Sequence, residues 1–316
     1  MPVCRAFSPA IKAMLKHRLI FGTLMTILFT AVVILDAWLD GSITESTADD
    51  RSIQATILTL LITAIIIPAQ RELSSLIEAA SAAGNNLRPF KPLITIASII
   101  FATVWYWQQF VPVTPAQAVL YLSGFLLPIL LLYQYLNFGI AGAVANCGVN
   151  YFAVAYIGIL SAFIMAIRIE MGGTALLMYV FVVKSADIGA YTTGKLFGKT
   201  PFSPVISPKK TWQGLGGAVI LSVLTALVFS LLFDIMNWAW AVVFAALFAV
   251  LGQLSDLAES IMKRDARQKD SGCTNSASET GRPHGIAASG FGGILDIADS
   301  ILGTAFFAYL FFLMLN

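Results

Sequence analysis

A dense group of charged residues follows an apolar run in the segment 255–272. If this segment is helical, Asp256, Glu259, Ser260 and Lys263 are spaced at i, i+3, i+4 and i+7 and share one face. Two carboxylates, a hydroxyl and an ammonium on one face can hold a metal ion and a phosphate group. An ionisable side chain at bilayer depth costs about 2.5 to 3.5 kcal/mol, so such a helix is expected to face a wet, functional interior.

A second polar group lies at the start of the last apolar segment, where Asp296, Asp299 and Ser300 are spaced at i, i+3 and i+4. Because Mg2+ prefers a few carboxylates shared with substrate phosphates, we predict that Asp256 and Asp296 are metal ligands. The alternative for Asp296 is a helix-capping role. Two acidic helix faces near lysine-bearing loops indicate metal-assisted phosphoryl or nucleotidyl transfer.

Two lysine-bearing segments are predicted on the same side of the protein. In the first, Lys184 and Asp187 are three residues apart in an apolar segment, and the alternative is that they only neutralise each other. The second is the loop 200–217, whose lysines and hydroxyls suit anions or, alternatively, anchor the protein to anionic lipid headgroups. This loop carries four candidate phosphate ligands, Ser207, Lys209, Lys210 and Thr211.

The composition is typical of a membrane protein. Hydrophobic residues make up 58% of the chain, charged residues 11%, and the mean hydropathy is +0.82, whereas soluble domains carry about 25% charged residues. A membrane-spanning helix needs about 20 mainly apolar residues. We therefore predict an all-α, polytopic helical membrane protein with about nine transmembrane helices, at residues 18–38, 53–69, 92–111, 117–137, 149–167, 173–194, 214–233, 238–260 and 293–315.

The two halves of the chain differ in character, although we expect one integral-membrane unit. Residues 1–170 are predicted to be N-terminal transmembrane helices with few polar groups, and residues 171–316 a C-terminal transmembrane catalytic region. The polar stretch 70–91 between two predicted spans is expected to be a cytoplasmic connection, either a solvated linker or one that includes a short interfacial helix. A homodimer formed through the apolar first half is a hypothesis for which the sequence offers no motif.

Basic residues predict the orientation, because Lys and Arg collect in cytoplasmic loops. With the N-terminus inside, all but three of the 19 Lys and Arg residues fall in cytoplasmic segments, the exceptions being Arg51, Arg168 and Lys184. This predicts an integral membrane protein with its N-terminus and active site in the cytoplasm, and a bacterial inner membrane suits the compact chain. Three scattered cysteines without CxxC spacing predict neither a disulfide framework nor a zinc site, and no nucleic-acid partner is implied.

At the charged segments the chain resembles the phosphatidate cytidylyltransferases, also called CDP-diacylglycerol synthases. Residues 207–217 and 187–199 are similar to two characteristic segments of that family. The first part of the family signature matches Ser260, Lys263, Arg264, Lys269, Asp270 and Gly272, and the second part matches Gly290, Gly292, Gly293, Asp296 and Asp299.

The resemblance implies transfer of CMP from CTP to phosphatidate, with Mg2+ and a second monovalent or divalent cation. It implies that Asp256 and Asp296 hold the metal and that Asp270 belongs to the catalytic set. The implied phosphate ligands are Lys209, Lys210, Lys263, Arg264 and Lys269, supported by Asp187, Ser207, Thr211 and Ser260. Membrane lipids are the expected surroundings of the acyl chains.

Two positions depart from the family pattern. Phe291 stands where the family has a histidine, and Ile297 stands where it has an arginine, so two phosphate-binding groups are missing. An insertion of about 13 residues relative to the family spacing carries Arg282 and His284, which we hypothesise to replace them. Two other functions are therefore kept open: a CTP-dependent kinase of a polyprenol or another lipid alcohol, and a catalytically impaired paralogue that binds lipid.

Overall fold

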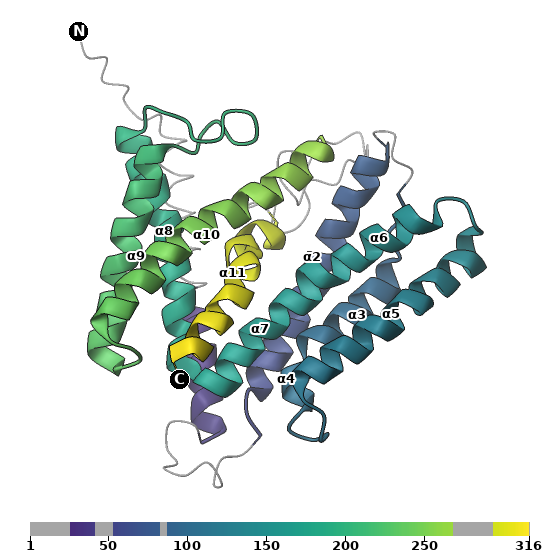
Figure 1. Ribbon diagram of the computed structural model, residues 1–316, viewed down its shortest axis with the longest axis horizontal. Coiled ribbons are helices and arrows are strands. Elements are labelled where there is room, and N and C mark those ends of the chain that lie inside the picture. Colours follow the sequence, from purple (N-terminus) through teal and green to yellow (C-terminus); the bar gives the residue numbers. More distant parts are fainter. Residues whose placement is uncertain (1–25, 42–52, 83–86, 268–292, 316) are drawn as a thin grey trace.

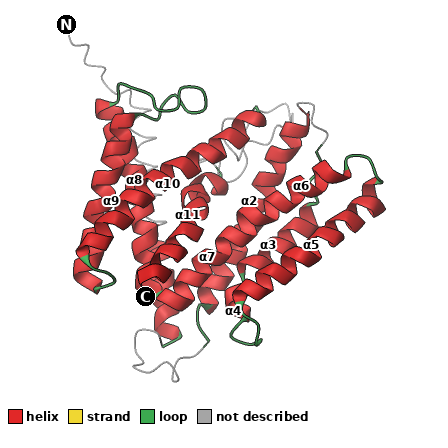
Figure 2. Cartoon of the chain, viewed as in Figure 1, coloured by secondary structure: helices red, strands yellow, loops and turns green. Residues whose placement is uncertain are grey.

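The computed structural model describes residues 26–41, 53–82, 87–267 and 293–315 (Figure 1). Every regular element in these ranges is a helix (Figure 2). An isolated antiparallel bridge joins Pro201 to Thr211. The predicted all-α class is confirmed.

Seven of the described helices are long and apolar enough to cross a membrane. They are α2 (Thr56–Ala80), α5 (Pro115–Phe138), the continuous rod Ala143–Met171, α8 (Gly173–Phe197), α9 (Trp212–Phe233), α10 (Trp238–Asp265) and α11 (Ile294–Leu315). The rod contains α6 (Ala143–Val154) and α7 (Leu160–Ala166), each followed by a π-helical turn, η3 (Ala155–Ile159) and η4 (Ile167–Met171).

The two remaining predicted spans coincide with shorter apolar helices. The segment 18–38 overlaps the helix Thr26–Leu39, and 92–111 overlaps α3 (Lys91–Ala102) and the short α4 (Val104–Trp107). The protein is thus a polytopic integral membrane protein, while the count of nine spans stays a prediction.

The connection predicted at 70–91 is largely helical instead. Helix α2 continues through Pro68 and past the predicted end of the span to Ala80. Leu73, Leu76 and Ile77 on this extension are buried, so packing against neighbouring helices explains why a polar stretch stays helical. As a result Glu72 lies on a helix and not in a loop.

Helices α8 and α9 lie side by side at one edge of the molecule, with α10 crossing them (Figure 1). Small residues let the two backbones approach closely, as is common between membrane helices. A Cβ atom added at Gly189 would lie 2.9 Å from the carbonyl carbon of Gly217 and 3.1 Å from Cα of Ala218. Ser222 strengthens the contact by donating a hydrogen bond of 3.0 Å to the carbonyl of Val182.

Helix α11 packs against α10 on one side and against α2 and α7 on the other. The rings of Phe244 and Phe248 on α10 meet Phe311 on α11. Tyr179 on α8 donates its hydroxyl to the carbonyl of Ile301, at 2.5 Å. The last helix is therefore held from several directions, which fixes the residues near its N-terminus.

Arg168 is buried near the start of α8, at the end of the bundle opposite the N-terminus of α11. Its side chain is 1% exposed and pairs with Asp36 at 3.0 Å and Asp40 at 2.6 Å. Asp36 also accepts the backbone N–H groups of Ile57 and Leu58 at the start of α2. A residue counted in the predicted topology as an external cation is thus an internal ion-pair partner that joins three segments.

The α8–α9 contact predicts a difference between two glycine substitutions. We expect Gly189→Ala to lower the free energy of unfolding in detergent by about 1 to 3 kcal/mol, because the new methyl group would overpack against the backbone of α9. Gly216→Ala is the control, since a Cβ atom there meets nothing within 4 Å and alanine favours the helix. Equal stability of the two variants would contradict the close approach.

Candidate functional site

Ionisable side chains from four segments meet: the middle of α8, the C-terminal part of α10, the first turns of α11 and the loop before α9. In this group, lysines of one segment contact carboxylates or other acceptors of a neighbouring segment. We call this group the lysine–carboxylate cluster and define it as Lys184, Asp187, Lys210, Asp256, Glu259, Lys263, Asp296 and Asp299.

Lys210 joins the loop before α9 to helix α10. Its ammonium lies 3.1 Å from Oδ2 of Asp256 and donates to the carbonyl of Gln253 at 3.0 Å. The loop ends in Thr211, whose hydroxyl caps α9 by accepting the N–H of Gly214 at 3.1 Å. The predicted anion-binding loop is therefore anchored directly on the acidic face of α10.

Lys263 joins α10 to α11. Its ammonium pairs with Oε2 of Glu259 at 2.8 Å, one turn earlier on α10, and with Oδ1 of Asp296 on α11. Oδ2 of Asp296 accepts the N–H of Gly293 at 2.7 Å, which caps the helix. The capping interpretation is therefore confirmed for one oxygen of Asp296, and the other oxygen belongs to the cluster. The metal-ligand role stays a prediction.

Lys184 joins α8 to α11. It donates to Oδ2 of Asp187 at 3.1 Å, to the carbonyl of Ile297 at 2.8 Å and to Oγ of Ser300 at 2.7 Å. Ser300 in turn donates to Oδ2 of Asp187 at 3.1 Å. The Lys184–Asp187 pair that the sequence analysis gave as the alternative is present, and it also contacts the last helix.

Three carboxylate oxygens of the cluster are buried without a hydrogen-bond partner: Oδ1 of Asp256, Oε1 of Glu259 and Oδ1 of Asp296, the last of which forms an ion pair with Lys263. Among the residues that the structure describes, no set of three His, Cys, Asp or Glu side chains is arranged to bind a metal ion. Mg2+ nevertheless needs only one or two carboxylates when substrate phosphates and water supply the other oxygens. The oxygen donors present here therefore fit Mg2+ in kind.

The other predicted site residues are arranged around the cluster. Lys209 is exposed, Ser260 is half-buried on α10, and Ser207 forms a backbone turn with Lys210 at 3.1 Å. Arg264 donates its Nε to the carbonyl of Ile206 at 3.3 Å, which ties α10 to the loop. Lys269 and Asp270 lie outside the described residues, as do Arg282, His284 and Phe291.

Glu72 on α2 is a participant that the sequence reasoning missed. Its two carboxylate oxygens accept the backbone N–H groups of Ile294 and Leu295, each at 2.9 Å. A carboxylate is favoured at a helix N-terminus because the free N–H groups and the helix dipole attract negative charge. Little in the sequence signalled this contact, because Glu72 follows Arg71 in the polar stretch 70–91 and no local pattern pairs it with a helix more than 200 residues away.

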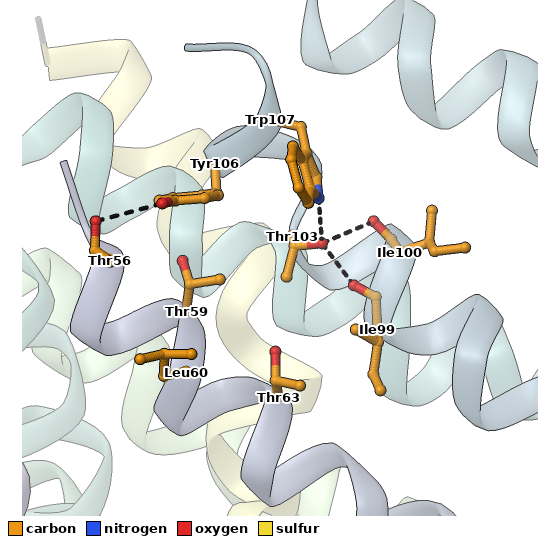
Figure 3. A pocket seen from close by; sticks show the side chains of 9 residues that line it. All are labelled: Thr56, Thr59, Leu60, Thr63, Ile99, Ile100, Thr103, Tyr106 and Trp107. Atoms are coloured by element: carbon orange, nitrogen blue, oxygen red, sulfur yellow. Dashed lines mark hydrogen bonds between the residues drawn. The ribbon is translucent and has the colours of Figure 1, made fainter. Parts of the chain in front are cut away.

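Two cavities in the described part of the protein lie away from the cluster. One, of about 310 Å3, lies between α2 and the α3–α4 segment and is lined by threonines, aliphatic residues, Tyr106 and Trp107 (Figure 3). The other, of about 310 Å3, lies beside Arg168 and Gly173. Neither lining includes a residue of the lysine–carboxylate cluster.

The chain is similar to a known protein family over most of its length. A model of the Cytidylyltransferase family matches residues 51–315. Phosphatidate cytidylyltransferase of Haemophilus influenzae is 33% identical over 150 residues, which cover 45% of this chain and 48% of that protein. The Bacillus subtilis protein of the same name is 34% identical over 160 residues, or 50% of this chain and 55% of that protein.

A third relative, the phosphatidate cytidylyltransferase of Staphylococcus epidermidis, is 36% identical over 152 residues. The matched part covers 48% of this chain and 53% of that protein. The chain thus spans about half the length of the curated relatives it matches.

The contact of Glu72 with α11 predicts a local effect of Glu72→Ala. We expect the amides at the start of α11 to exchange with solvent about tenfold faster, because losing a cap costs about 1 kcal/mol or more. Hydrogen–deuterium exchange read by mass spectrometry checks this. Glu78→Ala is the control, since Glu78 on the same helix forms an exposed ion pair with Lys91. The same exchange in both variants would show that Glu72 does not cap α11.

Proposed function

Because the chain belongs to the cytidylyltransferase family, we propose that it transfers CMP from CTP to phosphatidate and releases pyrophosphate, forming CDP-diacylglycerol. The observation that carries the proposal is the meeting of two lysines and two carboxylates from separate motif segments, Lys210 with Asp256 and Lys263 with Asp296. A reaction between two phosphate-bearing substrates requires such a concentration of opposite charges.

The reaction needs no nucleophile from the protein. An oxygen of the phosphatidate phosphate attacks the α-phosphorus of CTP, the bond to the bridging oxygen of the β-phosphate breaks, and pyrophosphate leaves with the electron pair. The protein contributes alignment and neutralisation of charge. The ion pairs keep their partly exposed lysines in place until a triphosphate arrives.

In the proposed mechanism Lys210 and Lys263 exchange their carboxylate partners for phosphate oxygens. Lys209 and Arg264, and Lys269 beyond the described part of the chain, add positive charge. Asp256 and Asp296 would hold Mg2+, which when bound neutralises charge on the triphosphate. A second cation stays a hypothesis.

The lipid substrate fits an enzyme of this shape. Apolar side chains of α9, including Leu224, Val228 and Leu231, are exposed, and we propose that such faces contact membrane lipids. The cluster would lie at the cytoplasmic surface of a bacterial inner membrane, where CTP meets the lipid headgroup. The division at residue 170 and the homodimer also stay proposals.

The two other functions predict different products. A lipid-alcohol kinase would transfer the γ-phosphate of CTP and release CDP, and an impaired paralogue would leave CTP intact. CTP labelled separately on the α- and γ-phosphates distinguishes them. Only the α label enters the lipid if our proposal is correct.

The mechanism predicts that removing either proposed metal ligand abolishes synthesis. In purified protein with phosphatidate, CTP and Mg2+, we expect Asp256→Asn and Asp296→Asn each to lower kcat about 100-fold or more, because one electrostatic group at such a site is worth about that factor. Asp234→Asn serves as the control. Asp234 ends α9 with φ of 50°, a conformation that asparagine also adopts readily.

Full activity of both cluster variants would refute the assigned roles. Absence of any CDP-lipid from the wild-type protein, with its fold intact, would refute the proposed acceptor or the reaction itself. The control separates a loss of activity in the two cluster variants from a general effect of removing an acidic group.

A further inference from the structure

Every hydrogen-bond donor of Lys184 is used within the protein. An ammonium group has three N–H donors, and here they reach Asp187, Ser300 and the carbonyl of Ile297. The ammonium group of Lys184 therefore has its hydrogen-bond donors occupied without a bound substrate. It differs in this respect from an exposed lysine such as Lys209, and its geometry is that of a clamp between α8 and α11.

The carbonyl that Lys184 binds belongs to the residue that departs from the family pattern. Ile297 stands where the pattern has an arginine, and Lys184 places its ammonium 2.8 Å from the Ile297 oxygen. We propose that Lys184 is a positioning residue that supplies, from α8, the positive charge missing from the side chain at position 297. Only the predicted effect of Lys184 on kcat rests on the proposed function.

The charge is needed because carboxylates crowd this end of the bundle. Asp256 interacts electrostatically with Asp187 and Asp299, and like charges in a partly buried site repel each other strongly. Lys210 is required for phosphate in the mechanism above, so its charge is shared with the substrate. Lys184 stays with the carboxylates throughout and holds the first turns of α11 in register with α8.

A simpler role would be neutralisation of Asp187 alone. That role predicts that a second substitution restores activity to a Lys184 variant only if it places a positive group on α8. The proposed role predicts instead that a positive group can return from α11, because residues 297 and 300 lie three apart on that helix and share a face, and Ser300 already contacts Asp187 at 3.1 Å. The two roles can therefore be separated by moving the charge.

The experiment compares Lys184→Met, Ile297→Arg and the double variant with the wild-type protein. We expect Lys184→Met to lower kcat about 10- to 100-fold, as a small misplacement of aligned groups does, with KM for CTP changed less than about threefold. The double variant should recover at least about tenfold over Lys184→Met. Ile297→Arg alone should gain nothing, because Lys184 already fills the role. Lys91→Met, which removes an exposed ion pair with Glu78, is the matched control.

Amide exchange along the first turns of α11 gives a readout that does not depend on turnover. Exchange should rise in Lys184→Met, return toward the wild-type rate in the double variant, and stay unchanged in Lys91→Met. If the wild-type protein makes no CDP-lipid, the proposed function fails while this pattern still tests the clamp. The inference is overturned if Lys184→Met keeps wild-type kcat and exchange, if the double variant is no better than Lys184→Met, or if exchange rises equally in all helices.

Discussion

Ionisable side chains inside an apolar helix bundle must be paired, because removing one partner of a buried ion pair costs about 3 to 5 kcal/mol. This chain meets the constraint at both ends of the bundle, in different ways. Arg168 is enclosed with Asp36 and Asp40, and all three side chains are at most 3% exposed. The side chains of Lys184, Lys210 and their acidic partners are between 17% and 31% exposed. The first arrangement suits a structural link, whereas the second leaves charged groups within reach of a ligand.

The accessible pairs depend on how α11 is held. Glu72 from α2 binds its N-terminus, Lys184 from α8 binds its second turn, and Ser255 from α10 donates to the carbonyl of Asp299 at 2.6 Å. Three helices thus fix one short stretch that carries two acidic residues. A residue from the first half of the chain thus contacts the catalytic region that we propose for the second half.

Local spacing predicted much of this site because it needs only helix geometry. Glu259 and Lys263 lie four residues apart on one face of α10, as the spacing predicted, and there they form an ion pair. The pairing of Lys210 with Asp256 could not be predicted in the same way, since it depends on how the loop before α9 folds over α10. Glu72 was missed for a related reason: the extension of α2 that carries it is stabilised by packing and not by its own apolar character. Sequence predicted which residues are unusual, and the fold decided which of them meet.

The most direct test is equilibrium binding of CTP to purified protein with and without Mg2+, in the absence of any lipid acceptor. We predict that CTP binding requires Mg2+. We also predict that Lys210→Met and Lys263→Met each weaken this binding about tenfold or more, since charged contacts to phosphate are among the strongest hydrogen bonds. Lys91→Met should bind as the wild type does. Wild-type affinity in both cluster variants would contradict the claim that the lysine–carboxylate cluster is the triphosphate site.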